Sequence, residues 1–209
     1  MSLQIQGVVG PPSAIPVGLA GTIRLGAGGD QIVSGLRGKY YEATRRGQVF
    51  NAMVTTATTW TIGLATTYTG LMLYNPSSQV NLELLSYGLA LSTVQSANVV
   101  FGLGLGTITP ALYKAMTITA LAANSSLAGS GLTAQGVALV AATPLSPAPL
   151  YAETLGNFGY STAVDANAGL LNVDLSGRYV LLANSYAIVT IGQSAKVGFA
   201  SLTWAEVPV

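Results

Sequence analysis

Side chains capable of acid–base, nucleophilic or metal chemistry are scarce in this sequence. It contains seven aspartate and glutamate residues, no histidine and no cysteine. The common soft metal ligands, the Ser-His and Cys-His nucleophile pairs and the usual near-neutral proton shuttle are therefore missing. Asp165 and Asp174 lie beside expected turns and Glu83 lies within an expected strand, so the spacing of the carboxylates indicates no catalytic pair. We expect a protein without enzymatic activity, cofactor, metal or small-molecule substrate.

Two glycine-rich stretches have the composition of nucleotide-binding loops without their pattern. Gly102, Gly104 and Gly106 have a G-x-G-x-G spacing with no helical pattern and no Lys-Ser/Thr pair after them, and residues 26–29 fail the same test. Alternating glycines within a strand indicate instead a β-bulge or a close approach of the backbone.

Positive charge is concentrated near the start of the chain. Between Arg24 and Arg46 there are five basic residues against two acidic ones, whereas the rest of the chain has three basic and five acidic residues. Arg45 and Arg46 could bind phosphate or carboxylate groups on a partner, and we predict Arg37, Lys39, Arg45 and Arg46 as candidate partner contacts. A solvated pair beside a strand is the simpler alternative. Nucleic-acid binding would need a larger basic patch with interleaved aromatic residues, so we expect none.

The low overall charge also restricts how the chain exists in its working state. Charged residues make up 7% of the sequence, against about 25% in an ordinary soluble domain. A free monomer with so few charges would be poorly protected against association. We infer that neighbouring protein subunits or a membrane cover much of the surface.

Membrane insertion is the less favoured of these two explanations. Residues 115–152 carry no charge, but serine, threonine, asparagine, glutamine and three prolines interrupt them, so we expect no spanning helix. A transmembrane β-barrel is a minority alternative, because alternating strands and ten tyrosines suit it. Against it, the first basic residue is Arg24 and no compact apolar core with a cleavage site follows the start, so we expect no export signal.

Two long apolar-bearing segments organise the rest of the chain. Residues 68–74 and 80–91 alternate as strands do, and residues 75–78 (Asn-Pro-Ser-Ser) form a turn between them. The apolar residues of the second segment fall on two faces: Val80, Leu82 and Leu84 on one, Leu85, Tyr87, Leu89 and Leu91 on the other. We predict an antiparallel hairpin, which needs a second sheet to cover it.

The remaining pattern predicts an all-β fold. We expect strands at 40–50, 52–62, 99–105, 113–121, 137–142, 170–175, 178–191 and 195–207, loops at 124–131 and 165–169, and an extended crossing between sheets at 143–149. Eight to ten such strands indicate an antiparallel β-sandwich or barrel, and we predict a jelly-roll-like sandwich at residues 39–209. Residues 1–38 hold nine glycines and three prolines, and we predict an extended Gly/Pro-rich N-terminal arm ordered by a neighbour; a flexible tail is the alternative.

Three short segments resemble a known group of proteins: YEATRRGQVF at 41–50, TGLMLYNP at 69–76 and LTWAEVP at 202–208. With the strands between them, they resemble virion proteins of tailed bacteriophages, namely capsid decoration or cement proteins and related head-surface fibres. The resemblance covers about residues 40–208 and includes no catalytic signature. It implies a jelly-roll-like sandwich, trimeric or otherwise symmetric, on the outside of an icosahedral shell, with the arm engaging the shell or an adjacent copy.

The function that follows from this resemblance is structural. We predict a non-enzymatic virion protein, made in the host cytoplasm, that decorates and stabilises a phage capsid by bridging shell subunits through large low-charge interfaces. Its partners would be the major capsid protein and copies of itself, as a homotrimer. The alternative is a receptor- or glycan-binding head fibre or tail module, in which exposed tyrosines stack on sugars. The candidates for that surface are Tyr74, Tyr87, Tyr151, Tyr160 and Tyr186.

Overall fold

The computed structural model describes residues 39–60, 66–92, 99–143, 145, 147–158, 170–191 and 197–209. Within it, Glu42–Val209 forms one compact unit. The predicted arm at 1–38, including Arg37, lies outside the described residues, as do Tyr160 and the predicted turn at 165–169.

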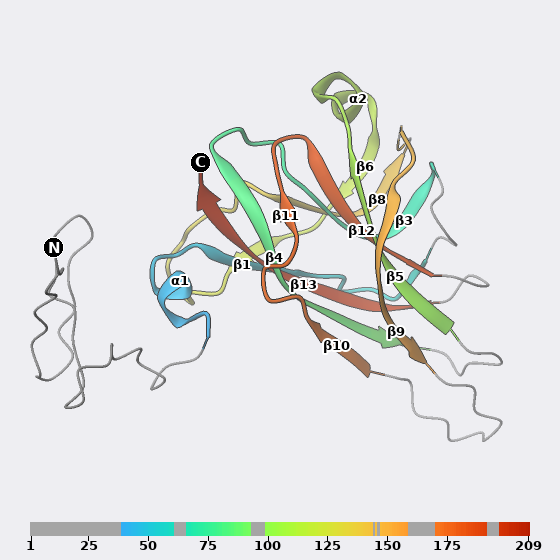
Figure 1. The fold of residues 1–209 in the computed structure, drawn as a ribbon, viewed down its shortest axis with the longest axis horizontal. Helices are drawn as coiled ribbons and strands as arrows, with labels where there is room; N and C mark the ends of the chain where they lie inside the picture. The colour runs from blue at the N-terminus through green and yellow to red at the C-terminus, as the bar shows by residue number, and fades with distance from the viewer. Residues whose placement is uncertain are drawn as a thin grey trace, which may run out of the picture. The chain divides into compact units, whose positions relative to one another are not determined.

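Two antiparallel sheets pack as a β-sandwich (Figure 1), which confirms the predicted all-β antiparallel fold. Sheet 1 has the strand order β10 (Leu170–Asp174), β4 (Val80–Leu91), β13 (Val197–Pro208), β1 (Val49–Met53) and β7 (Ala123–Ser125). Two short strands join sheet 1 at the side: β11 (Val180–Leu181) pairs with β4, and β2 (Thr58–Thr59) pairs with β13. Sheet 2 has the order β6 (Thr117–Ala120), β8 (Val137–Thr143), β3 (Tyr68–Tyr74), β12 (Ser185–Ile191), β5 (Val99–Thr107) and β9 (Leu150–Phe158). The jelly-roll connectivity stays a prediction.

The main core fills the space between the two sheets. Trp204 stacks on Phe50 with ring centroids 6.2 Å apart, and Trp60 meets Phe101 edge-on at 6.5 Å. Leucines of β4 and β13 and apolar residues of β5 and β12 complete this core. Burial of large aromatic side chains from both sheets is the main force that holds such a sandwich together.

A second core covers the outer face of sheet 2. It contains Tyr68, Met72 and Tyr74 of β3, beside apolar residues of β8 and β12. The helix α2 (Pro110–Ala115) packs on this core through Tyr113, whose ring stacks on Tyr74 with centroids 4.2 Å apart. β3 lies between β8 and β12 in sheet 2 and is covered on both faces. Its apolar residues on both faces fit this position.

The predicted hairpin is wrong, although both of its strands have the predicted bounds. β3 pairs with β8 and β12 in sheet 2, whereas β4 pairs with β13 and β10 in sheet 1. The segment between them therefore crosses from one sheet to the other. Asn75 is fully buried there, and its side-chain NH₂ donates to the carbonyls of Val80 (2.8 Å) and Leu181 (3.0 Å), while its side-chain oxygen accepts from the Ser77 N–H (3.0 Å). These hydrogen bonds satisfy buried polar groups in a crossing segment that is not itself part of a strand.

The prediction that the two halves of β4 turn their apolar side chains to opposite faces is also wrong, because β4 contains a β-bulge. Leu84 lies opposite Trp204 and Ser86 opposite Thr203, so Leu85 is an extra residue on β4. The bulge shifts the alternation by one residue. Val80, Leu82 and Leu84 therefore share the main core with Tyr87, Leu89 and Leu91.

Two predicted strands begin as helices instead. Within 40–50, the helix α1 (Tyr41–Arg45) precedes β1, and Gly47 (φ +72°) ends it with its N–H bonded to the Thr44 carbonyl at 2.9 Å. Within 113–121, α2 precedes β6. Thr109 caps α2 by accepting the Leu112 N–H at 3.2 Å, and Pro110 is its first residue, a combination that favours a helix start.

Two connections and one strand also differ from the predictions. The segment at 143–149 links β8 to β9 within sheet 2 and does not cross between sheets. The predicted loop at 124–131 includes the end of β7, and β9 itself was not predicted. The alternating glycines of β5 do mark close approach, as predicted, since a Cβ at Gly106 would overlap the ring of Tyr186. No helix among the described residues is long and apolar enough to cross a membrane.

Candidate interaction surfaces

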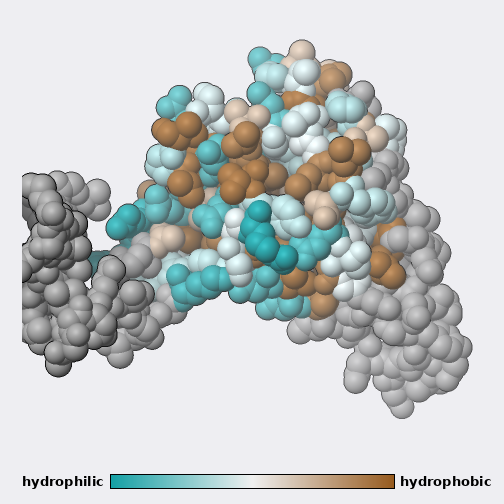
Figure 2. Space-filling model, in the orientation of Figure 1, coloured by the Kyte–Doolittle hydropathy of each residue, from teal (hydrophilic) through white to brown (hydrophobic). Residues whose placement is uncertain are grey.

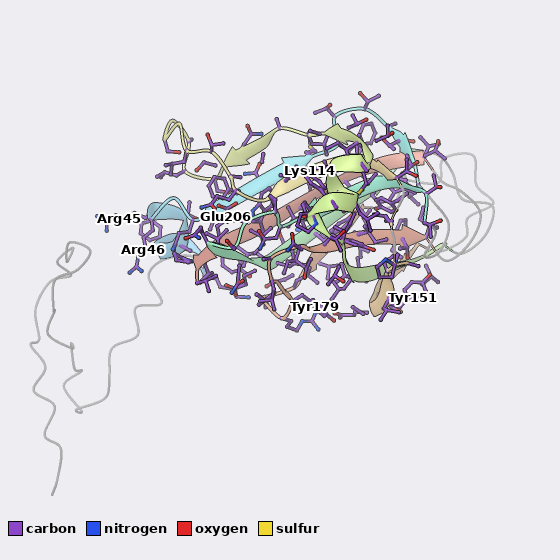
Figure 3. All side chains as sticks on the ribbon, turned by 90° about the horizontal axis from the view of Figure 1, so that it is seen from above. Arg45, Arg46, Lys114, Tyr151, Tyr179 and Glu206 are labelled. Atoms are coloured by element: carbon purple, nitrogen blue, oxygen red, sulfur yellow. The ribbon has the colours of Figure 1, made fainter. Side chains whose placement is uncertain are left out.

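Two of the predicted basic residues, Arg45 and Arg46, lie at the end of α1. Arg45 ends the helix and Arg46 follows it; both are exposed, and Figure 3 shows them pointing away from the sandwich. Neither forms an ion pair with another described residue. Lys39 is exposed, with its Nζ 5.0 Å from the centroid of the Tyr40 ring. The structure thus brings Arg45 and Arg46 together at one exposed position, and their contact with a partner stays a prediction.

One carboxylate is buried inside the sandwich, and sequence reasoning did not single it out. Glu206 of β13 is 6% exposed. Its Oε1 accepts hydrogen bonds from the backbone N–H groups of Gln135 and Gly136, each at 2.8 Å, and from Trp204 Nε1 at 3.3 Å. Glu206 therefore fastens the segment that leads into β8 onto the end of β13, the central strand of sheet 1. An acidic residue next to a core tryptophan in a strand is the sequence signal that could have found it.

A second carboxylate joins the two sheets at their β9 and β10 edges. Glu153 of β9 accepts a hydrogen bond from the Tyr179 hydroxyl at 2.7 Å and forms an ion pair with Arg178 at 3.1 Å. The hydrogen bond to Glu153, followed by partial burial, raises the pKa of Tyr179. We call Glu153, Arg178 and Tyr179 the latch. The latch connects sheet 2 to the turn between β10 and β11 of sheet 1.

The other carboxylates of the sandwich are also turned toward their own chain. Asp174 accepts the Ser176 N–H at 2.8 Å and the Ser176 hydroxyl at 3.0 Å, in the turn after β10. Glu83 is half-buried against Gly177, where a Cβ would overlap its carboxylate. Of the four described carboxylates between Val49 and Val209, three accept hydrogen bonds from their own chain and the fourth, Glu83, packs against Gly177. The described residues contain no group of three or more metal-ligating side chains.

Large apolar side chains remain exposed on the sandwich. The most exposed in the strands and their connections are Leu150 (75%), Leu182 (59%), Tyr151 (56%), Met53 (56%) and Val180 (51%). Figure 2 shows hydrophobic patches interspersed with hydrophilic ones on the face that it presents. A surface of this kind suits contact with other protein.

A shallow hollow lies beside one exposed tyrosine. The ring of Tyr151 covers Gly102, where a Cβ would lie 3.0 Å from it. Val100, Gly102, Tyr151 and Thr154 line a hollow of about 200 Å³, less than the roughly 300–1,000 Å³ of typical ligand pockets. In Figure 3, Tyr151 lies at the opposite end of the sandwich from Arg45 and Arg46.

The predicted sugar-stacking surface is not formed by most of its candidate tyrosines. Tyr74, Tyr87 and Tyr186 are at most 2% exposed. Burial raises the pKa of Tyr87, and raises that of Tyr186 to about 12. Their rings pack in the two cores because large aromatic groups contribute most when they are removed from water. Of the candidates within the described residues, only Tyr151 is exposed.

Comparison with known proteins found no relative of this chain. Neither a scan against protein-family models, nor a search of curated proteins, nor a search of solved structures returned a match.

Proposed function

We propose that this chain is a non-enzymatic structural protein of a tailed-bacteriophage virion, which decorates and stabilises the capsid. It would act on the capsid surface by bridging subunits of the major capsid protein, with copies of itself as further partners, as a homotrimer by the resemblance. The proposal combines the sequence resemblance with the nature of the protein's surface.

The observation that carries the proposal is how the charges of the sandwich are used. Glu206 is buried, Glu153 is held in the latch, and Asp174 caps a turn. Large apolar side chains such as Leu150 and Leu182 stay exposed. Permanent protein interfaces are poor in charge and rich in apolar groups, so this surface is better suited to contact with other subunits than to bulk water.

The two cores supply the rigidity that such a role needs. β3 and β12 are buried on both faces, so sheet 2 is held by packing from two sides. A protein that binds many sites on an assembled shell stabilises that state by mass action, provided that it binds the expanded or open shell less well. The exposed pair Arg45–Arg46 supplies a positive contact for acidic groups on the shell.

Co-sedimentation with empty capsids tests the proposal. The capsids are assembled from the major capsid protein encoded in the same genome, and the bound fraction is measured across protein concentrations. We expect saturable binding by the full chain. We expect at least about fivefold weaker binding for Arg46→Glu, because reversing a contact charge opposes docking. Lys114→Glu, the same charge reversal on α2, is the matched control and should bind as the wild type does.

Each arm of this experiment has a result that would count against part of the proposal. No binding by the wild type would overturn capsid decoration. Equal binding by Arg46→Glu and the wild type would overturn the role of the basic residues. Deletion of residues 1–38 should leave the sandwich folded and abolish attachment; normal decoration by the truncated chain would show that the arm is not the attachment segment.

A further inference from the structure

The edge strand β6 is short, but it lacks the other features that normally keep an edge from pairing. Among the described strands, β6 ends sheet 2 on one side and pairs with β8 alone. All four of its residues, Thr117, Ile118, Thr119 and Ala120, are exposed. An edge strand presents a row of unpaired N–H and C=O groups, and proteins usually protect it with lysine, proline, bulges or a covering segment. β6 contains no lysine and no proline.

The opposite edge of the same sheet shows what a protected edge looks like in this molecule. The register of β9 on β5 skips Leu155 and Ala152, so β9 carries two bulges of its own. Its Glu153 is held in the latch, and a Cβ at Gly156 would meet the Leu171 side chain of β10. By contrast, the one irregularity between β6 and β8 skips Val140, a residue of β8, and leaves β6 regular.

We propose that β6 pairs with β6 of a second copy of this chain, antiparallel about a twofold axis, so that sheet 2 continues across the two copies. This pairing rests on the proposed function, which includes contact between copies of the chain. Thr117–Ala120 would form that contact, by backbone hydrogen bonds along the edge of sheet 2.

The sequence of β6 is compatible with meeting itself. A twofold axis perpendicular to a sheet keeps each side chain on its own face, so residues of equal parity lie opposite one another. In the register that we propose, centred on Ile118, Ile118 lies opposite Ile118 of the other copy and Thr117 lies opposite Thr119. Pairs of β-branched residues and Thr–Thr pairs are favourable across strands.

The charge pattern also favours a second copy over another occupant. Residues 115–152 contain no charged side chain, so two identical edges can approach without like-charge repulsion. A partner of opposite charge would find nothing to bind on β6. The edge fits an uncharged strand, and the copy itself supplies one.

Sedimentation equilibrium of the full-length chain, across protein concentrations and without capsids, tests the pairing. We expect a reversible assembly with an even number of copies, either a dimer or two trimers joined at β6. Ile118→Lys places two lysines directly opposite each other, and we expect a dissociation constant of this contact at least about tenfold higher. Thr154→Lys, at an exposed residue on β9, is the matched control and should associate as the wild type does. Thr119→Lys replaces Ile118→Lys if that variant does not fold.

A covalent test uses the absence of cysteine from the chain. Ile118→Cys should form a disulfide-linked pair under mild oxidation, because directly opposed residues of an antiparallel pair are within disulfide range. Thr154→Cys on β9 should stay unlinked. A wild type that is monomeric or purely trimeric, or an assembly that Thr154→Lys dissociates and Ile118→Lys does not, would overturn the pairing. Because no capsid is present, failure here is distinct from failure of capsid decoration.

Discussion

On one side of the sandwich, β9 carries two bulges in its pairing with β5. The latch links β9 to the turn after β10, and Leu171 of β10 lies against Gly156 of β9. On the other side, the chain passes from β6 of sheet 2 to β7 of sheet 1 through residues 121–122, and β6 has exposed, uncharged residues. Both sides end the same pair of sheets, yet the ionic groups are on the first. The ion pair of Glu153 with Arg178 lies at the first edge, whereas β6 has no charged side chain.

The anchors behind the two sides differ in the same way. The latch is partly open to water, with Arg178 52% and Glu153 26% exposed in their side chains. The segment that leads into β8, on which β6 pairs, is instead fastened by the buried Glu206. A buried hydrogen-bonded carboxylate contributes more than an exposed ion pair, because its partners would otherwise be left unsatisfied away from water. Three substitutions test this difference between the two sides.

The largest loss of stability is expected from substitution of the buried Glu206. Glu206→Ala removes the acceptor of two backbone N–H groups and of Trp204 Nε1, and we expect the free energy of unfolding to fall by about 2–4 kcal/mol. Urea unfolding followed by far-UV circular dichroism measures it. Glu206→Gln keeps an acceptor oxygen and should lose clearly less. A loss below about 0.5 kcal/mol for Glu206→Ala, the range of an ordinary surface substitution, would remove the distinction between the two anchors.

The sequence predicted the strands well where alternation was strong. The predicted bounds 68–74 and 80–91 are those of β3 and β4, and the last strand begins and ends within two residues of the prediction. Local pattern could not assign these strands to sheets. The choice between a hairpin and a crossing depended on the burial of Asn75 and on partners such as Leu181, 106 residues away.

The candidate surfaces could be predicted only in part, for the same reason. The basic pair Arg45–Arg46 was visible because it is contiguous in sequence. Glu206 and its partner Gln135 are 71 residues apart, and Glu153 and Tyr179 are 26 apart, so only the fold brings them together. The short helix α2 was hidden by apparent alternation, although Thr109 and Pro110 signalled its start.

A smaller effect is expected from opening the latch. Arg178→Ala removes the ion pair with Glu153 and the Nε hydrogen bond to the Leu175 carbonyl, and we expect a loss of about 0.5–1 kcal/mol. Hydrogen exchange should become faster in β9 while the centre of sheet 2 stays protected. Lys114→Ala is the control, since no ion pair of Lys114 with a described residue is present. Equal exchange in β9 of both variants would show that the bulges alone protect that edge.

The smallest effect is expected from the titration of Tyr179 in the latch. The hydrogen bond to Glu153 raises the pKa of Tyr179 above that of the unfolded chain, so the folded state holds this proton to higher pH. Its contribution to stability is fully present below about pH 10 and is lost as pH rises through the folded-state value. Comparing Tyr179→Phe with the wild type from pH 8 to 11 by urea unfolding isolates this contribution from that of the buried tyrosines. The difference in unfolding free energy between the two proteins should shrink above pH 10.

β6 itself has no titratable side chain. Association through β6 should therefore be the same for Tyr179→Phe and the wild type at each pH of this range while the fold persists. A difference between the two proteins that stays constant up to pH 11 would mean that the Tyr179 hydroxyl does not stabilise the latch through Glu153.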